Sequence, residues 1–196
     1  MIKPNGFEET REFGEYTPLE LGGHKLTIMK VEECSASTGT QYIKVSFDTA
    51  KDDVQPNYFS NQYKQDTRTE KKWSGVTTVF PTDKDGKTSR AFKTFCTSIE
   101  KSNAGFKMVW GDKFCDALKG KFIGGVFGEE EYEDSYGEVK TARKLFWFRS
   151  IEGVMDADVP QKRTLDKDEK QTATPQYNPY ANVSFEQITD DDDLPF

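Results

Sequence analysis

The alternation of apolar and polar residues predicts a mainly β protein. It is clearest in residues 41–49 (QYIKVSFDT), where every second position from Ile43 to Phe47 is apolar, as in a strand with one buried face. Residues 24–32 (HKLTIMKVE) also have strand composition. The small and polar residues 35–40 (SASTGT) separate these two segments, so we expect the two strands to form a hairpin.

Three more strands are expected further along the chain. Residues 75–80 (GVTTVF) form the third, and residues 121–132 and 139–150 form the last two on either side of a turn at residues 134–137. The fourth strand contains several glycines, which indicate bulges or the sharp curvature that a small barrel needs. These glycines are Gly124, Gly125 and Gly128.

Two helices are predicted between the third and fourth strands. Apolar residues from Phe92 to Ile99 recur at helical spacing after Ser89, a residue type that caps helices, and residues 103–105 should end this helix. A shorter helix is expected over residues 112–119, with its first residue as the cap and a glycine directly after it.

The order strand, strand, strand, helix, strand, strand is that of a five-stranded OB-fold Greek-key barrel, with one or two helices between strands 3 and 4. Other small β-rich folds can give the same order. We expect this domain to cover residues 13–153, after a flexible N-terminus at residues 1–12. Residues 154–185 are rich in proline and charge and predict a flexible linker, and residues 186–196 a disordered acidic tail.

The negative charge of the chain is concentrated near its C-terminus. Residues 156–196 hold ten acidic and four basic side chains of the chain's 34 and 27, which leaves 24 acidic and 23 basic residues before them. A body so close to neutrality can still bind a polyanion where its lysines cluster. The formal net charge of −7 is therefore weak evidence against a nucleic-acid partner.

Three cysteines and one histidine limit the chemistry. Cys34, Cys96 and Cys115 are odd in number and widely spaced, which argues against a disulfide framework and a zinc site and favours a reducing compartment. The sequence has no secretory leader and no apolar run long enough to cross a bilayer. We expect a cytoplasmic protein with no cofactor, no bound metal and no membrane partner.

The chain ends in an acidic run followed by an apolar hook. Such a segment has too little apolar surface to fold alone, but it can dock its phenylalanine in an apolar pocket and its carboxylates on lysine and arginine. An acidic run by itself usually serves solubility, but a solubilising tail has no reason to finish in Leu-Pro-Phe. We therefore assign partner binding to Asp190, Asp191, Asp192, Asp193, Leu194, Pro195 and Phe196.

Residues 191–196, Asp-Asp-Asp-Leu-Pro-Phe, resemble the acidic tip of bacterial single-stranded-DNA-binding proteins, which usually ends Asp-Asp-Asp-Ile-Pro-Phe. The only departure is Leu194, which has the same volume as isoleucine. In that family the tip recruits replication, recombination and repair proteins, and it competes with DNA for the protein's own binding groove. The resemblance implies the same two roles for this tip.

The body is similar to the small single-strand-binding proteins that tailed bacteriophages encode. The similarity spans most of residues 13–150 and includes the stretches GEYTPLELGGHKLTI and STGTQYIKVSFD, followed by a glycine-containing strand into EEEY. It implies an OB barrel and a role in phage DNA replication or recombination, inside a bacterial or phage-infected cell.

Binding a single strand without sequence preference requires cations for the phosphates and aromatic faces for the bases. Residues 64–93 carry eight basic and four acidic side chains, in and beside a polar loop rich in aromatic residues. On the second strand, a tyrosine and a lysine share the face opposite the core. We therefore expect DNA binding at Tyr42, Lys44, Lys64, Arg68, Lys71, Lys72, Trp73, Lys84, Lys87, Arg90, Lys140, Arg143 and Trp147.

The aromatic residues have a structural interpretation as well. Trp73 lies in a polar loop, and core packing and base binding are equally favoured interpretations of it. For Trp147, core packing is favoured over base binding. Six phenylalanines are assigned to the core: Phe47, Phe80, Phe92, Phe95, Phe122 and Phe146.

Three other functions stay open. A strand-annealing or recombination mediator would use the same surface, and an acidic protein that mimics DNA would bind no oligonucleotide. A nuclease would need Mg²⁺ ligands, but Glu129 to Glu131 are consecutive and alternate across a strand, and His24 has no Cys or Asp beside it in the sequence. The nucleotide-binding motif GxxxxGK[ST] and the hydrolase motif GxSxG are absent, which argues against ATP-driven remodelling and common hydrolase chemistry. We therefore predict a non-enzymatic protein that coats and protects single-stranded DNA. Whether it forms a homo-oligomer stays open.

Overall fold

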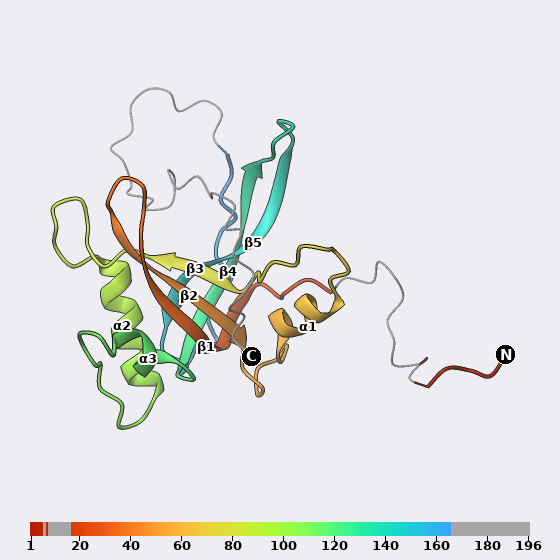
Figure 1. Ribbon diagram of the computed structural model, residues 1–196, viewed down its shortest axis with the longest axis horizontal. Coiled ribbons are helices and arrows are strands. Elements are labelled where there is room, and N and C mark those ends of the chain that lie inside the picture. The colour runs from red at the N-terminus through yellow and green to blue at the C-terminus, as the bar shows by residue number, and fades with distance from the viewer. Residues whose placement is uncertain (6, 8–16, 166–196) are drawn as a thin grey trace.

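The computed structural model describes residues 1–5, 7 and 17–165. The predicted tip at residues 186–196 lies outside this part of the chain, as do the predicted linker from residue 166 on and part of the predicted N-terminal segment. Figure 1 shows the described elements in chain order from red to blue. They are β1 (Gly22–Ser35), β2 (Gln41–Thr49), α1 (Tyr58–Gln65), β3 (Val76–Val79), α2 (Arg90–Ser102), α3 (Phe114–Leu118), β4 (Phe122–Glu133) and β5 (Val139–Arg149).

The five strands join one antiparallel sheet in the order β3-β2-β1-β4-β5, which confirms the mainly β class and the five strands. The central strand β1 is shared between two neighbours. Its residues from Leu26 onward pair with β2, and residues Gly22 to Thr27 pair with β4. A register shift between Ile28 and Lys30 disrupts the ladder just after this overlap, where a bulge bends a strand and increases its twist.

The sheet is open, so the barrel that the order of elements predicts is not confirmed. Within the described residues β3 pairs with β2 alone and β5 with β4 alone, so these two strands form its edges. A barrel closes only when its two edge strands pair. With four residues, Val76–Val79, β3 offers few ladder positions for such a pairing.

The core lies between one face of the sheet and the helices. The cross-strand neighbours Ile28 and Phe47 are at most 2% exposed, and α2 contacts β4 and β5. The ring centroids of Phe95 on α2 and Phe148 on β5 are 5.1 Å apart. Figure 1 shows α2 and α3 together at one flank of the sheet and α1 at the other.

Helix α2 begins and ends as the sequence predicts. The Ser89 hydroxyl accepts a hydrogen bond from the backbone N–H of Phe92 at 3.1 Å, and the helix stops at Ser102. The shorter helix α3 is reduced to Phe114–Leu118, and the residue before it is Lys113, so the predicted cap at residue 112 is wrong. The side chain of Lys113 makes no cap hydrogen bond.

Helix α1 lies in the polar stretch for which no element is predicted. Asn57 precedes it in a left-handed conformation and gives no side-chain cap. The cap comes from β2 instead, where the Asp48 carboxylate accepts from the backbone N–H groups of Phe59 at 2.9 Å and Ser60 at 3.3 Å. Because this cap is distant in sequence, no local signal marks the helix.

The structure corrects two core assignments. Phe47, Phe92 and Phe95 are buried as predicted, whereas Phe122 is 36% exposed and Trp147 is 46% exposed. Each lies on the face opposite the core, and the Lys25 ammonium lies 4.6 Å from the centroid of the Phe122 ring. The other two assigned phenylalanines, Phe80 and Phe146, are half-buried.

The chain after β5 packs back onto the sheet. Val154 is 1% exposed, and a Cβ added at Gly23 would lie 1.6 Å from the Val154 carbonyl oxygen, so only glycine fits there. Further along, the Arg163 N–H donates to the Glu129 carbonyl at 2.9 Å and its carbonyl accepts from the Glu131 N–H at 2.8 Å. Figure 1 shows this segment in blue beside the β4–β5 hairpin.

A buried ion pair fixes the loop after β2 to the start of β1. His24 is 1% exposed, with Nδ1 2.8 Å from the Asp53 carboxylate and Nε2 3.0 Å from the Glu20 carbonyl. Both partners accept hydrogen bonds, which favours the doubly protonated imidazolium form of the ring. Burial alone would lower the pKa of His24, but the hydrogen bonds and charges of Asp53 and Glu20 together outweigh it, and the net pKa is raised. Burial alone would raise the pKa of Asp53, but its bonds to His24, Gln55 and Lys25 together outweigh it, and the net pKa is lowered.

This pair predicts a pH-dependent stability. The His24 contribution is complete below its ordinary pKa of 6.5 and is lost as the pH rises through the higher folded-state pKa. The Asp53 contribution is complete above 3.8 and is lost as the pH falls through its lowered pKa. Asp53→Asn should lower the free energy of unfolding by about 3–5 kcal/mol near pH 6, because it leaves the buried His24 charge without its partner. It should also remove the loss of stability above pH 6.5. Urea denaturation across the pH range measures both effects.

The control is Asp52→Asn, because Asp52 carries an exposed carboxylate paired with Lys25. It should leave the pH profile unchanged. Parallel losses of stability above pH 6.5 in wild type and Asp53→Asn would contradict the assignment.

Candidate nucleic-acid interface

The outer face of β2 presents Tyr42 and Lys44, as the alternation predicts. Their neighbours Ile43 and Val45 are at most 3% exposed and point into the core, whereas Tyr42 and Lys44 are half-buried. The Tyr42 ring packs against Phe80 at the end of β3, with ring centroids 5.9 Å apart. One aromatic pair and one ammonium therefore lie next to each other on the outer face of two strands.

The loop after β3 brings more cations to the same end of these strands. A hydrogen bond from the Ser89 hydroxyl to the Phe80 carbonyl closes its base, at 2.5 Å. Inside the loop the Asp83 N–H donates to the Lys87 carbonyl at 2.7 Å, which makes a tight turn. Its lysines are exposed, and Arg90 follows as the first residue of α2. We call this set the β2–β3 surface: Tyr42, Lys44, Phe80, Lys84, Lys87 and Arg90.

The segment that enters β3 carries the second group of predicted cations. Lys64 and Lys72 are exposed, the Arg68 guanidinium is paired with the Asp66 carboxylate at 2.6 Å, and the Lys71 ammonium lies 5.6 Å from the centroid of the Tyr63 ring. The bond to Arg68 lowers the pKa of Asp66 to about 2. This segment meets the first residue of β3, and the β2–β3 surface meets its last, so a strand of roughly 13 Å separates the two groups.

Trp73 holds this segment against the core. Its indole N–H donates to the carbonyls of Phe47 at 3.3 Å and Gly75 at 3.0 Å, and its ring packs on the core cluster. Its ring centroid is 6.0 Å from that of Tyr63. The half-buried indole therefore has a clear packing role, and its partly accessible edge lies next to the cations of the segment.

The third predicted group, on β5, lies at the other edge of the sheet and among carboxylates. The Lys140 ammonium is paired with Asp134, and the bond between them lowers the pKa of the Asp134 carboxyl. The Arg143 guanidinium donates to the Leu19 carbonyl and lies 3.8 Å from Glu129. Trp147 is exposed on the outer face. The fold does not bring this group together with the β2–β3 surface.

With this geometry established, the chain was compared with known proteins. No family model and no curated protein matches it.

Metal and membrane sites were also sought in the part of the chain that the structure describes. No three His, Cys, Asp or Glu side chains there are grouped so that they could hold a metal ion. None of the helices among these residues is long and apolar enough to cross a membrane. The three cysteines are free.

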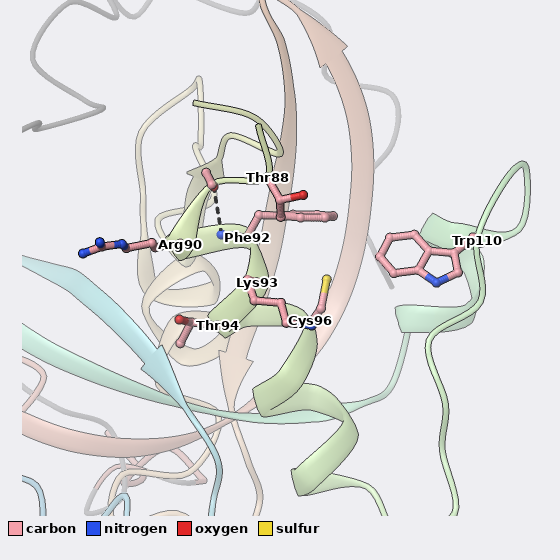
Figure 2. A pocket seen from close by; sticks show the side chains of 8 residues that line it. Thr88, Arg90, Phe92, Lys93, Thr94, Cys96 and Trp110 are labelled. Atoms are coloured by element: carbon pink, nitrogen blue, oxygen red, sulfur yellow. Dashed lines mark hydrogen bonds between the residues drawn. The ribbon is translucent and has the colours of Figure 1, made fainter. Parts of the chain in front are cut away.

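One feature near the β2–β3 surface was missed in the sequence. A hollow of about 740 Å³ lies between α2 and the segment before α3, and Figure 2 shows Trp110 across from Phe92 and Cys96. The signal that could have indicated it is a tryptophan followed by a glycine, in the connection between two predicted helices. At this position the tryptophan belongs to no apolar pattern that would assign it to the core.

The packing of Trp73 yields a test of its structural role. Trp73→Ala should lower the free energy of unfolding by about 2 kcal/mol, because it removes a half-buried ring from the core edge. Trp73→Phe should cost about 1 kcal/mol, since it loses only the indole hydrogen bonds. Lys72→Ala, at the exposed neighbouring position, should change the free energy of unfolding by less than about 0.5 kcal/mol. Thermal or urea denaturation of the three variants measures these differences. A Trp73→Ala variant as stable as wild type would show that the ring does not support the loop.

Proposed function

We propose that this chain is a non-enzymatic single-stranded-DNA-binding protein that coats and protects unpaired strands during DNA replication, recombination or repair. The observation that carries the proposal is the β2–β3 surface. It combines a half-buried aromatic pair, Tyr42 and Phe80, with the cations Lys44, Lys87 and Arg90, which form no ion pair within the described residues. Stacking platforms beside cations are what sequence-tolerant binding of single strands requires.

The environment of Tyr42 suits a base-stacking role beside phosphates. Burial and the neighbouring Cys34 thiol raise the pKa of its hydroxyl, so the ring stays neutral at physiological pH. A neutral phenol can approach the phosphate backbone without repulsion, and its hydroxyl can donate to a phosphate oxygen. Lys44 lies two residues further along the same strand face, so the Cα atoms of the two residues are about 7 Å apart.

We further propose that the sheet is an OB-type barrel in its partly open form. Support comes from the strand order, in which β1 pairs with β2 and β4, and from the position of α2 and α3 between β3 and β4. In OB folds the face of strands 2 and 3 and the adjoining loops bind oligonucleotides. In this proposal the β2–β3 surface corresponds to that face.

The acidic residues of the body argue for DNA binding over DNA mimicry. A mimic needs uncompensated carboxylates on its folded face, but three of the four carboxylates of β4 are paired with cations. Glu130 is 3.0 Å from Lys144, and Glu131 is 2.7 Å from Lys162. This pairing reduces the negative charge that the hairpin presents in place of a phosphate backbone.

Residues 190–196 are proposed to recruit replication, recombination and repair proteins. The support is the match of residues 191–196 to the acidic tip of bacterial single-stranded-DNA-binding proteins. A tethered acidic segment also competes with DNA for cations, with an effective concentration near millimolar for a short flexible tether.

Fluorescence anisotropy with labelled oligonucleotides tests the binding function. We expect the protein to bind oligo(dT) and to bind the matching duplex much more weakly. With about four phosphate contacts, log K should fall with log salt with a slope near −3, because each contact on a single strand contributes about −0.7. Lys44→Ala, Lys87→Ala and Arg90→Ala should each flatten this slope by about 0.7.

The control variant is Lys140→Ala, because its ammonium is already paired with Asp134. It should change neither affinity nor slope. Equal effects of Lys140→Ala and Lys87→Ala would place the interface elsewhere, and failure of the wild-type protein to bind at low salt would overturn the proposal. An increase in the rate of pairing of complementary strands would favour the annealing alternative.

Deletion of residues 190–196 separates the tip from DNA binding. We expect the truncated protein to bind oligo(dT) as tightly as the full chain or more tightly, because a competing anion is gone. The matched control replaces Phe196 by Ala and keeps the four aspartates, and it should lose partner recruitment while DNA affinity stays near that of the full chain. A truncation that abolished oligonucleotide binding would contradict the division of roles.

A further inference from the structure

One side of the hollow beside α2 is formed by the solvent-exposed side chain of Trp110. Trp110 is 65% exposed, and its ring is stacked on Phe114 with centroids 5.6 Å apart and planes 14° apart. Its centroid is 6.2 Å from that of Phe92 on α2. Packing therefore supports the indole from one side and leaves the rest of a large flat ring accessible.

The charge of the lining selects for an anionic ligand. Both charged residues of the lining, Arg90 and Lys93, are basic, and the polar ones are hydroxyl residues, Thr88, Ser89 and Thr94. Figure 2 shows the Arg90 side chain directed away from Trp110, so its guanidinium serves the rim and not the interior. The hollow thus combines an accessible ring with cations and hydroxyl groups, and its volume of about 740 Å³ is in the range of small-ligand sites.

Arg90 links the hollow to the β2–β3 surface, because it belongs to both. Ser89, the residue before it, also lines the hollow, and its hydroxyl donates to the carbonyl of Phe80, whose ring packs on Tyr42. A strand bound on the β2–β3 surface therefore reaches the hollow past the start of α2.

We propose that this hollow is a further subsite for an unpaired nucleobase, which stacks on Trp110 while Lys93 and Arg90 bind the flanking phosphates. The inference rests on the proposed function and extends its binding path beyond the sheet. A base fits the hollow better than an apolar peptide does, because every charged group of the lining is a cation and the ring is flat and backed by Phe114.

The experiment uses the full-length chain and oligo(dT) of about 16 nucleotides, near the upper site size of one OB fold. Trp110→Ala should weaken binding by roughly 5- to 100-fold and leave the salt slope unchanged, because the ring carries no charge. Trp110→Phe should retain most of the affinity. Lys93→Glu should flatten the salt slope. Tyr136→Ala removes a comparably exposed ring from the β4–β5 turn and should have no effect.

Abasic substitutions in the oligonucleotide locate the contact. At one position an abasic site should weaken binding by wild type but not by Trp110→Ala, which shows that this base and the ring interact. A variant that keeps Trp110 as the single tryptophan, Trp73→Phe with Trp147→Phe, should change its fluorescence on adding oligo(dT). This second readout holds even if Trp110→Ala folds poorly.

The outcomes separate the subsite from the function. Wild-type protein that binds no oligo(dT) overturns both. Binding that depends on Tyr42 and Lys44 but not on Trp110 overturns the subsite and leaves the function standing. A single-tryptophan signal that responds to a synthetic peptide of residues 186–196 and not to oligo(dT) also overturns the subsite, because the hollow would then hold an acidic peptide.

Discussion

The sharing of β1 between β2 and β4 is the constraint on which the rest of the molecule depends. A central strand of any sheet pairs with two neighbours, but β1 does so with different parts of its length: its first residues pair with β4 and its later residues with β2. The register shift after Ile28 lies just past the overlap, where a bulge bends a strand, and α2 packs against β4 and β5. The buried pair of His24 and Asp53 then fixes the loop after β2 to the first residues of β1, so both halves of the sheet keep their relative position.

Local ion pairing decides which cations can attract a phosphate. Arg143 and Lys144 of β5 face Glu129 and Glu130 of β4 in cross-strand ion pairs, and Lys140 is paired with Asp134 in the turn. Their positive charge is compensated by carboxylates of the same hairpin, so a phosphate would have to compete with these carboxylates for binding. The cations around β3 lie on loops and at a helix start, and Lys87 and Arg90 are paired with no carboxylate of the described residues. The same residue types therefore differ in how far their charge is already compensated, because of their position in the sheet.

The sequence predicts those parts of the fold that are determined locally. Alternation located β2, and the Ser89 cap with its apolar spacing located α2. It failed where the cause is distant: α1 is capped by Asp48 on β2, and the partner of His24 lies in a loop that follows another strand. In the candidate site, the alternation of residues along β2 was enough to predict that Tyr42 and Lys44 lie on its outer face. The pairing of Lys140 with Asp134 depends on the register of the hairpin, which the sequence does not give. No local sequence pattern predicts the exposed position of Trp110.

The segment after β5 continues the packing of the sheet. Composition predicts a linker from residue 154, but Val154 is buried and the backbone of Arg163 bonds to β4 on both sides of Glu130. The Arg163 guanidinium also lies 3.9 Å from the centroid of the Phe146 ring. Residues 154–165, the part of the predicted linker that the structure describes, are therefore held against the β4–β5 side of the sheet, because contacts distant in sequence outweigh a local composition rich in proline and charge.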